Sequence, residues 1–312
     1  MALAQLIKPW NVRGLRIGLA FGLAVFLLAL GRPAAAGTEM PYGEGLLWRI
    51  DGAGPAPSYL FGTMHSADEQ VNDLAQPVLD ALGESRSLSL EVIMTPESRM
   101  SLAFAMMLSD GRTLEQVVGP ELFERTVAAG QSYGFGQDHL RLFKPWAVMT
   151  LLSLPPSEVR RQAAGEKALD HRLQELASER GLALHGLEEM AEQIAMFNDM
   201  AESDQVAMLD STISQSGEVE LLFEQMRAAY LNRNPAEIFE MMQGQQTGFD
   251  PALVETFTER LLDTRNHRMA ERMQPRLAEG GAFVAVGALH LPGESGILKL
   301  LEGQGYRLTR LY

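Results

Sequence analysis

Two short stretches of sequence, YLFGTMH at residues 59–65 and AFVAVGALH at residues 282–290, follow one pattern. Each is a run of apolar residues typical of a buried strand, and each then reaches a glycine that is followed three positions later by a histidine. The glycine permits a sharp turn or a close approach of the backbone to a ligand. We therefore expect two strands that each run into a G-x-x-H motif, the first ending at His65 and the second at His290.

The segments around the two motifs repeat the order strand–strand–helix–strand. In the first unit, turn residues and apolar runs predict strands at 46–50, 59–62 and 87–93 and an amphipathic helix at about 68–82. In the second unit, they predict strands at 182–186, 282–287 and the final YRLTRLY, and a helix at about 294–302. We interpret this repetition as a duplication.

Between the two motifs, residues 97–275 are rich in helical patterns apart from the strand near 182–186. No low-complexity segment or linker divides residues 37–312. The predicted fold is therefore α/β (α+β). Duplicated β-β-α-β units form a central sheet, a large helical insertion separates them, and the whole is a single domain.

The composition excludes several classes of protein. The chain has 312 residues, of which 46% are hydrophobic and 21% are charged, so it is too apolar to be disordered. It has no cysteine, which excludes disulfides, thiol nucleophiles and cysteine-ligated metals. A net charge of −14 argues against nucleic acid as a partner, because such proteins neutralise phosphates with Lys and Arg.

The N-terminus has the features of a secretory signal peptide. Residues 1–36 contain four basic residues and no acid, and they include the apolar run IGLAFGLAVFLLAL at 17–30, followed by three alanines. This run is shorter than the roughly 20 residues that a spanning helix needs. We expect cleavage after Ala36 and a periplasmic or secreted protein of charge −18. The alternative is an uncleaved inner-membrane anchor, which would be the chain's only contact with a membrane.

Three residues are candidate metal ligands. His65 and His290 each follow the carboxyl end of a predicted strand, where open α/β sheets build their sites. Glu91 places a carboxylate in the otherwise apolar strand SLSLEVI. A buried carboxylate needs a cation, a metal or hydrogen bonds, although Glu91 on an edge strand would instead face water. Two imidazoles and a carboxylate can bind a divalent metal such as Mn, Co or Zn, which lowers the pKa of its bound water.

Arg265 and Asn266 are the candidate catalytic residues. They lie within a long amphipathic helical segment that leads towards the His290 strand. A guanidinium near a metal site can stabilise an oxyanion. The competing interpretation is that both residues belong to a solvated helix face.

These motifs resemble the TraB/GumN family, the bacterial group related to the animal Tiki proteins. The resemblance rests on the paired G-x-x-H motifs, the strand LSLEV, the pair Arg265-Asn266 and the C-terminal pattern GALHLPG…GI…L…GY. KPWAV at 144–148 and GLEEMAEQ at 186–193 are further landmarks of the family. The similarity covers about residues 44–312.

The resemblance implies a metal-dependent protease with His65, Glu91 and His290 among its functional residues. Manganese or cobalt is favoured in the Tiki proteins. Wider relatives resemble erythromycin-esterase-type hydrolases and haem-binding lipoproteins of the ChaN type, so the fold alone does not choose the activity. We expect an exported metal-dependent hydrolase that acts on a peptide or small-molecule substrate. The alternative is a non-catalytic protein that binds haem or a small ligand on the same scaffold.

Overall fold

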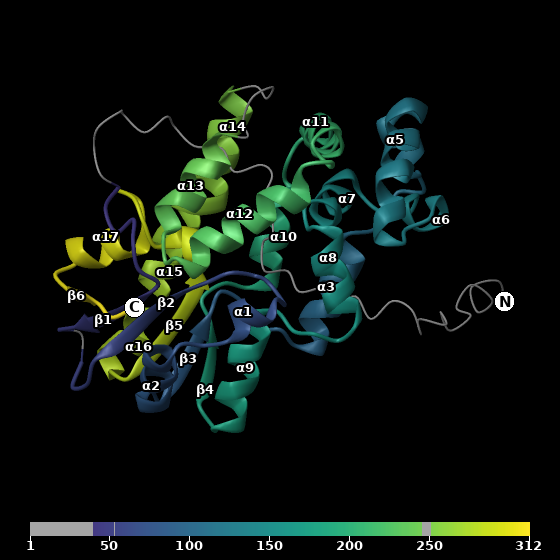
Figure 1. The fold of residues 1–312 in the computed structure, drawn as a ribbon. Coiled ribbons are helices and arrows are strands. Elements are labelled where there is room, and N and C mark those ends of the chain that lie inside the picture. The colour runs from purple at the N-terminus through teal and green to yellow at the C-terminus, as the bar shows by residue number, and fades with distance from the viewer. Residues whose placement is uncertain (1–39, 53, 245–250) are drawn as a thin grey trace.

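One six-stranded mixed sheet organises the protein in the computed structural model, which describes residues 40–52, 54–244 and 251–312 (Figure 1). Its spatial order is β4-β3-β5-β2-β1-β6. The strands are β1 (Leu47–Asp51), β2 (Ser58–Thr63), β3 (Ser87–Leu90), β4 (Ala183–Gly186), β5 (Ala282–Gly287) and β6 (Arg307–Arg310). The four strands from β4 to β2 are parallel neighbours, whereas β1 runs antiparallel to both β2 and β6. The predicted α/β class is therefore confirmed.

The strands that carry the two G-x-x-H motifs are direct neighbours. β2 and β5 pair in parallel, with Gly62 opposite Val286 and Thr63 opposite Gly287. Nearly every residue of both strands is buried, as expected of parallel strands that are covered on both faces. Both motifs therefore leave the sheet at the same end, where the carboxyl ends of β2 and β5 lie side by side.

The two β-β-α-β units share the order of their elements but differ in their pairing. In the first unit, β1 is the antiparallel neighbour of β2, and only six residues, 52–57, separate the two strands in the sequence. In the second unit, β4 is separated from β5 by β3 and runs parallel to it. A long connection through residues 187–281 permits this crossover.

Helices follow the strands of both units and fill the long segment between β3 and β5. Between β2 and β3 lie α1 (Glu69–Asn72) and α2 (Gln76–Glu84), and after β5 come η3 (Ala288–His290) and α17 (Ile297–Gly303). Between β3 and β4 lie α3 (Pro96–Ala105), α4 (Leu114–Val118), α5 (Pro120–Gly130), η1 (Gln131–Tyr133), α6 (Gln137–Leu140), α7 (Pro145–Leu152), α8 (Pro156–Ala163) and α9 (Leu169–Glu179). Between β4 and β5 lie α10 (Met190–Asn198), α11 (Glu202–Ser214), α12 (Val219–Leu231), α13 (Pro235–Gly244), α14 (Pro251–Thr258), the π-helical turn η2 (Glu259–Asp263), α15 (Thr264–Arg272) and α16 (Gln274–Glu279). The predicted helix-rich segment is thus observed, with β4 within it.

The hydrophobic core lies on both faces of the sheet. Alternate residues of a strand point to opposite faces, so Phe283 and Ala285 join the larger cluster while Val284 and Val286 join the smaller one. The larger cluster extends into the helices between α3 and η2, and the smaller one contains residues of α15, α16 and α17. The sheet is therefore held between two layers of helices, and its edges and ends remain for function.

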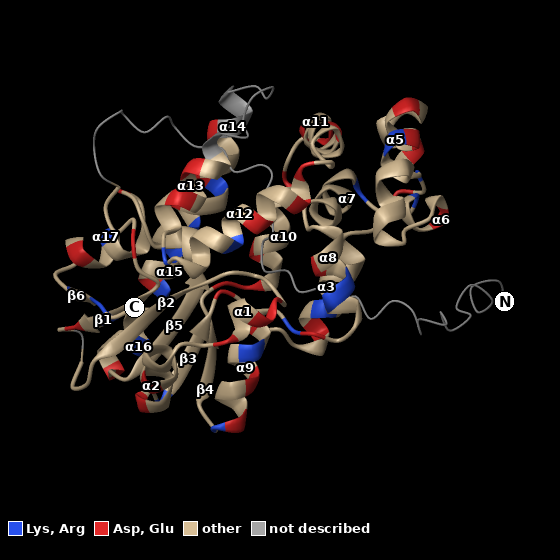
Figure 2. Ribbon diagram, viewed as in Figure 1, with Lys and Arg blue, Asp and Glu red and all other residues tan. Residues whose placement is uncertain are grey.

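The acidic excess of the chain is spread over many helices. Figure 2 shows Asp or Glu on α5, α9, α13 and α17, which lie in different parts of the ribbon. Among the residues that the structure describes, no helix combines the length and apolar character needed to cross a membrane. The predicted signal peptide, residues 1–36, lies outside the described residues, so its cleavage and the location of the protein stay predictions.

Candidate active site

A cavity lies where the carboxyl ends of β2, β3 and β5 face the helices α12, α13 and η2. Its lining includes His65, Glu91, Arg265 and His290, four of the five residues singled out from the sequence. The cavity has a volume of about 100 Å³. One buried water needs roughly 10–15 Å³, so there is room for a ligand.

The His65 imidazole has one ring nitrogen fixed and the other free. Its Nδ1 lies 3.0 Å from Oδ2 of Asp170, and Thr63 Oγ1 donates a 2.7 Å hydrogen bond to the other carboxylate oxygen. An ionised carboxylate only accepts, so Nδ1 carries the proton and Nε2 keeps its lone pair. Nε2 is buried and has no hydrogen-bond partner among the residues that the structure describes. In metal-binding histidines, one ring nitrogen is typically held by a carboxylate, which orients the lone pair of the other nitrogen towards the metal.

The loop that follows His65 is held by Glu158 of α8. Ser66 Oγ donates a 2.9 Å hydrogen bond to this carboxylate, and the Ala67 N–H donates to its other oxygen. The Glu158 side chain is fully buried. The G-x-x-H turn is therefore anchored from a helix some 90 residues away in the chain.

The His290 imidazole is fixed in a matching way. Its Nδ1 lies 2.6 Å from Oδ1 of Asn266, whose amide group also donates to the Ser295 carbonyl at 2.9 Å. Nε2 lies 3.2 Å from Nη1 of Arg265. A guanidinium only donates, so Nε2 accepts and Nδ1 carries the proton. Asn266 does not line the cavity and acts on the site by orienting His290.

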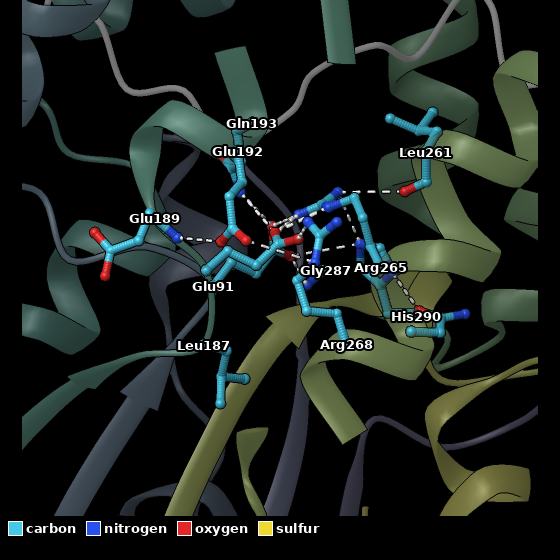
Figure 3. Close-up of polar contacts among 12 residues, drawn as sticks. Glu91, Leu187, Glu189, Glu192, Gln193, Leu261, Arg265, Arg268, Gly287 and His290 are labelled. Carbon is cyan, nitrogen blue, oxygen red and sulfur yellow. Dashed lines mark hydrogen bonds and ion pairs between the residues drawn. The ribbon is translucent and has the colours of Figure 1, made fainter. Parts of the chain in front are cut away.

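Glu91 and Arg265 form the charged centre of the site (Figure 3). Strand β3 ends at Leu90 rather than at the predicted residue 93, so Glu91 follows the strand. Its Oε1 accepts the Gly287 N–H at 2.7 Å, and its Oε2 lies 2.6 Å from Arg265 Nη2. Arg265 is only 1% exposed, and it also binds the buried Glu188 at 2.7 and 2.9 Å. The solvated-face interpretation of Arg265 is therefore wrong.

Arg265 sets the protonation states of its neighbours. Burial would raise the pKa of Glu91, but Arg265, His290 and the Gly287 N–H together lower it to about 2. Burial, together with the Arg265 charge, lowers the pKa of His290 to about 4, although the Glu91 and Glu188 charges act in the opposite direction. At neutral pH, Glu91 is ionised and His290 is neutral. Glu91 then carries its charge, and His290 keeps a lone pair on Nε2 that accepts from Arg265.

The π-helical turn η2 ends at Asp263, two residues before Arg265. Such turns replace the i→i+4 bonding pattern by i→i+5 and occur frequently at functional sites. The Arg265 guanidinium donates to the Leu261 carbonyl at 3.4 Å. Leu261, Leu262 and Arg265 all reach the cavity, so this one segment supplies both apolar and charged lining.

The donor atoms suit a divalent metal, but in this structure the Arg265 guanidinium contacts two of the three candidate ligands. Two imidazole nitrogens and a carboxylate are ligands that Zn, Mn and Co accept. Glu91 Oε1 lies 3.7 Å from His290 Nε2, yet Arg265 contacts both residues. Within residues 40–312 as described, no three His, Asp or Glu side chains are grouped to hold a metal ion. The ligand set His65, Glu91 and His290 stays a prediction, and its use requires the Arg265 contacts to change.

Three further residues of the site were not predicted from the sequence: Asp170, Glu158 and Glu188. Glu188 could have been found, because it follows β4 in the landmark GLEEMAEQ much as Glu91 follows β3. Asp170 and Glu158 belong to helices with several other charged residues. Nothing local separates them from solvated neighbours.

The buried His290 makes stability depend on pH in a defined window. Its folded pKa of about 4 lies below the ordinary value of 6.5, so between these values the unfolded chain binds a proton that the folded one does not. This stability is present above pH 6.5 and is lost as the pH falls towards 4, by about 3 kcal/mol in all. We expect His290→Gln to reduce the slope of unfolding free energy against pH in this window, measured by urea denaturation. Part of the slope should remain, because burial also lowers the pKa of His171 to about 4. The exposed His267→Gln should leave the curve unchanged, and equal slopes for wild type and His290→Gln would contradict the assignment.

Fold and site together define an α/β protein whose neighbouring parallel strands present two oriented histidines beside a buried carboxylate–arginine cluster. The sequence matches the model of the TraB/PrgY/gumN family over residues 46–310, and the chain belongs to this family. The predicted family membership is thereby confirmed.

Relatives of two kinds resemble the chain. The uncharacterized protein YbaP of Escherichia coli (strain K12) is 25% identical over 247 residues, which cover 78% of this chain and 87% of that protein. The metalloprotease TIKI1 of Danio rerio is 24% identical over 328 residues, covering 89% of this chain and 66% of the relative. The metalloprotease TIKI2 of the same fish is also 24% identical, covering 84% and 60%. No solved structure matches the chain.

Proposed function

We propose that this protein is a metal-dependent hydrolase, with the peptide bond as its substrate class. The observation that carries the proposal is the buried, unpartnered Nε2 of His65, which lines one cavity with His290 and Glu91. The resemblance to two metalloproteases supports the choice of chemistry. His65, Glu91 and His290 would hold the metal. When bound, it would polarise a carbonyl and lower the pKa of water.

The chain itself supplies orientation and charge. Asp170 and Asn266 hold Nδ1 of the two imidazoles, so that Nε2 of each carries the lone pair, which in His290 accepts from Arg265. Arg265 offers a buried guanidinium that can stabilise negative charge on a substrate oxygen. Glu188 accepts two hydrogen bonds from that guanidinium and so keeps it beside Glu91.

The test is metal stoichiometry together with hydrolysis. Purified protein equilibrated separately with Mn²⁺, Co²⁺ and Zn²⁺ should retain about one ion per chain of at least one of these metals and should cleave a mixed peptide library. His65→Ala and His290→Ala should abolish both properties, because each removes a ligand. The exposed His267→Ala is the matched control and should change neither. Unchanged metal content in both site variants would refute the site. A Soret band on adding hemin, lost in the same variants and without peptide cleavage, would favour the haem-binding alternative.

We further propose that the hydrolase works outside the cytoplasm after removal of residues 1–36. The basic leader and its short apolar run support this proposal. The N-terminal residue of the protein recovered from the periplasmic fraction should be Gly37. Recovery of the intact leader in the membrane fraction would support the anchored alternative instead.

A further inference from the structure

The cavity has two chemically different sides. Its polar side comes from residues after β2, β3 and β5 and from the start of α9, including His65, Glu91 and Asp170. Its apolar side comes from Met226 and Tyr230 of α12, Ile238 and Met242 of α13, and Leu261 and Leu262 of η2. A molecule that fills this space meets ionisable groups and apolar residues such as Met64 and Val92 on the strand side, and an apolar wall on α12, α13 and η2.

The apolar side is part of the hydrophobic core. Its six side chains are between 0% and 6% exposed and belong to the larger core cluster. The one hydroxyl among them, that of Tyr230, donates to the Gly62 carbonyl at 3.0 Å. Its hydrogen is therefore already used. This wall offers a ligand packing area but no unused hydrogen-bond donor.

The charged groups of the lining are engaged with one another. Arg265 is bound to Glu91 and Glu188, while the Asp170 carboxylate accepts from Thr63 and faces His65. Among the described lining residues, Arg265 is the only guanidinium or ammonium group. A charged side chain placed against the apolar wall would lose its hydration without gaining a partner. An apolar side chain would bury its surface at no such cost.

From these observations we infer that the wall of α12, α13 and η2 is a specificity pocket for a large, uncharged aliphatic side chain of the substrate. The two methionines are unbranched and adapt their shape, so the pocket accepts leucine-like and methionine-like groups alike. The inference rests on the proposed function only in treating this side chain as part of a hydrolysed substrate. Binding itself can be measured without any turnover.

The first experiment uses methionine methyl NMR on the wild-type protein. Protein labelled with ¹³C at methionine methyl groups is titrated with N-acetyl-leucinamide, N-acetyl-aspartamide or N-acetyl-lysinamide. The signals of Met226 and Met242, assigned with the volume-conserving changes Met226→Leu and Met242→Leu, should shift saturably with the leucine compound only. Met208 of α11 is buried but does not line the cavity, so its signal should stay fixed. The inference is overturned if the leucine compound causes no saturable shift, or if either charged compound causes an equal one.

The second experiment reads specificity from cleavage. In a peptide library, sites next to leucine or methionine should be cleaved in preference to sites next to aspartate or lysine. Leu262→Ala and Met242→Ala should each reduce that preference about 10-fold, the effect of a missing methylene or more in an apolar pocket. The matched core variant Met208→Ala should not. Cleavage that favours charged residues would overturn the inference while sparing the proposed function. NMR shifts without any cleavage would support the inference and contradict the proposed function.

Discussion

Replacing Arg265 by leucine is expected to lower the free energy of unfolding by about 3–5 kcal/mol. The guanidinium is 1% exposed and binds both Glu188 and Glu91, so its removal leaves two carboxylates in the interior without their main partner. The cost arises chiefly from these uncompensated charges rather than from lost packing, because leucine is itself apolar. Urea denaturation at pH 7 measures the change.

Two variants separate this explanation from a general sensitivity of the helices after η2. Arg276→Leu removes a partly exposed arginine that pairs with Glu279, three residues away, and contacts His185 at 3.5 Å, and it should cost less than about 1 kcal/mol. Adding Glu188→Gln to Arg265→Leu should recover part of the lost stability, because one buried charge is then removed. If the double variant were less stable than the sum of its single changes, the charge-based account would fail.

Replacing Glu158 by alanine is expected to lower the free energy of unfolding by about 2–4 kcal/mol and to loosen the His65 loop. The change leaves the Ser66 hydroxyl and the Ala67 N–H without their acceptor, and each buried unsatisfied donor costs about 1–3 kcal/mol. Hydrogen exchange should become faster at residues 66–67, and metal retention should fall because His65 directly precedes this loop. Denaturation and exchange measured by mass spectrometry test the two effects separately.

The control for this effect keeps the acceptor but removes the charge. Glu158→Gln retains one carbonyl oxygen for the Ala67 N–H, so it should cost less than Glu158→Ala and should protect that amide better. The exposed Glu166→Ala should affect neither stability nor exchange. Faster exchange at residues 66–67 in the Glu166 variant, or none in Glu158→Ala, would contradict the anchoring role.

The sequence predicted the part of the fold that depends on local pattern. The apolar runs before each G-x-x-H motif became β2 and β5, and the helix-rich segment was found where the periodicity placed it. The position of β4 at the sheet edge, beside β3, could not be predicted, because a four-residue strand carries no local signal for its partner.

Four of the five candidate site residues lie together in the structure, but the contacts between them were not predicted. His65, Glu91, Arg265 and His290 share one cavity, as their motifs indicated. The insertion of Arg265 between Glu91 and His290 was not foreseen, since helical periodicity gives a face but not the element that packs on it. The anchoring of His65 by Asp170 depends on residues more than 100 positions apart, and its metal-binding role awaits the assay described above.

The central position of β5 in the sheet has a consequence for folding during synthesis. This strand separates β2 from β3, yet its residues, 282–287, follow those of β1, β2, β3 and β4 in the sequence. A nascent chain that has not yet reached Ala282 lacks the strand that joins β2 to β3, and it also lacks His290. The proposed hydrolytic chemistry therefore arises only after residues 282–290 have been synthesised, and a chain terminated before them would carry none of it.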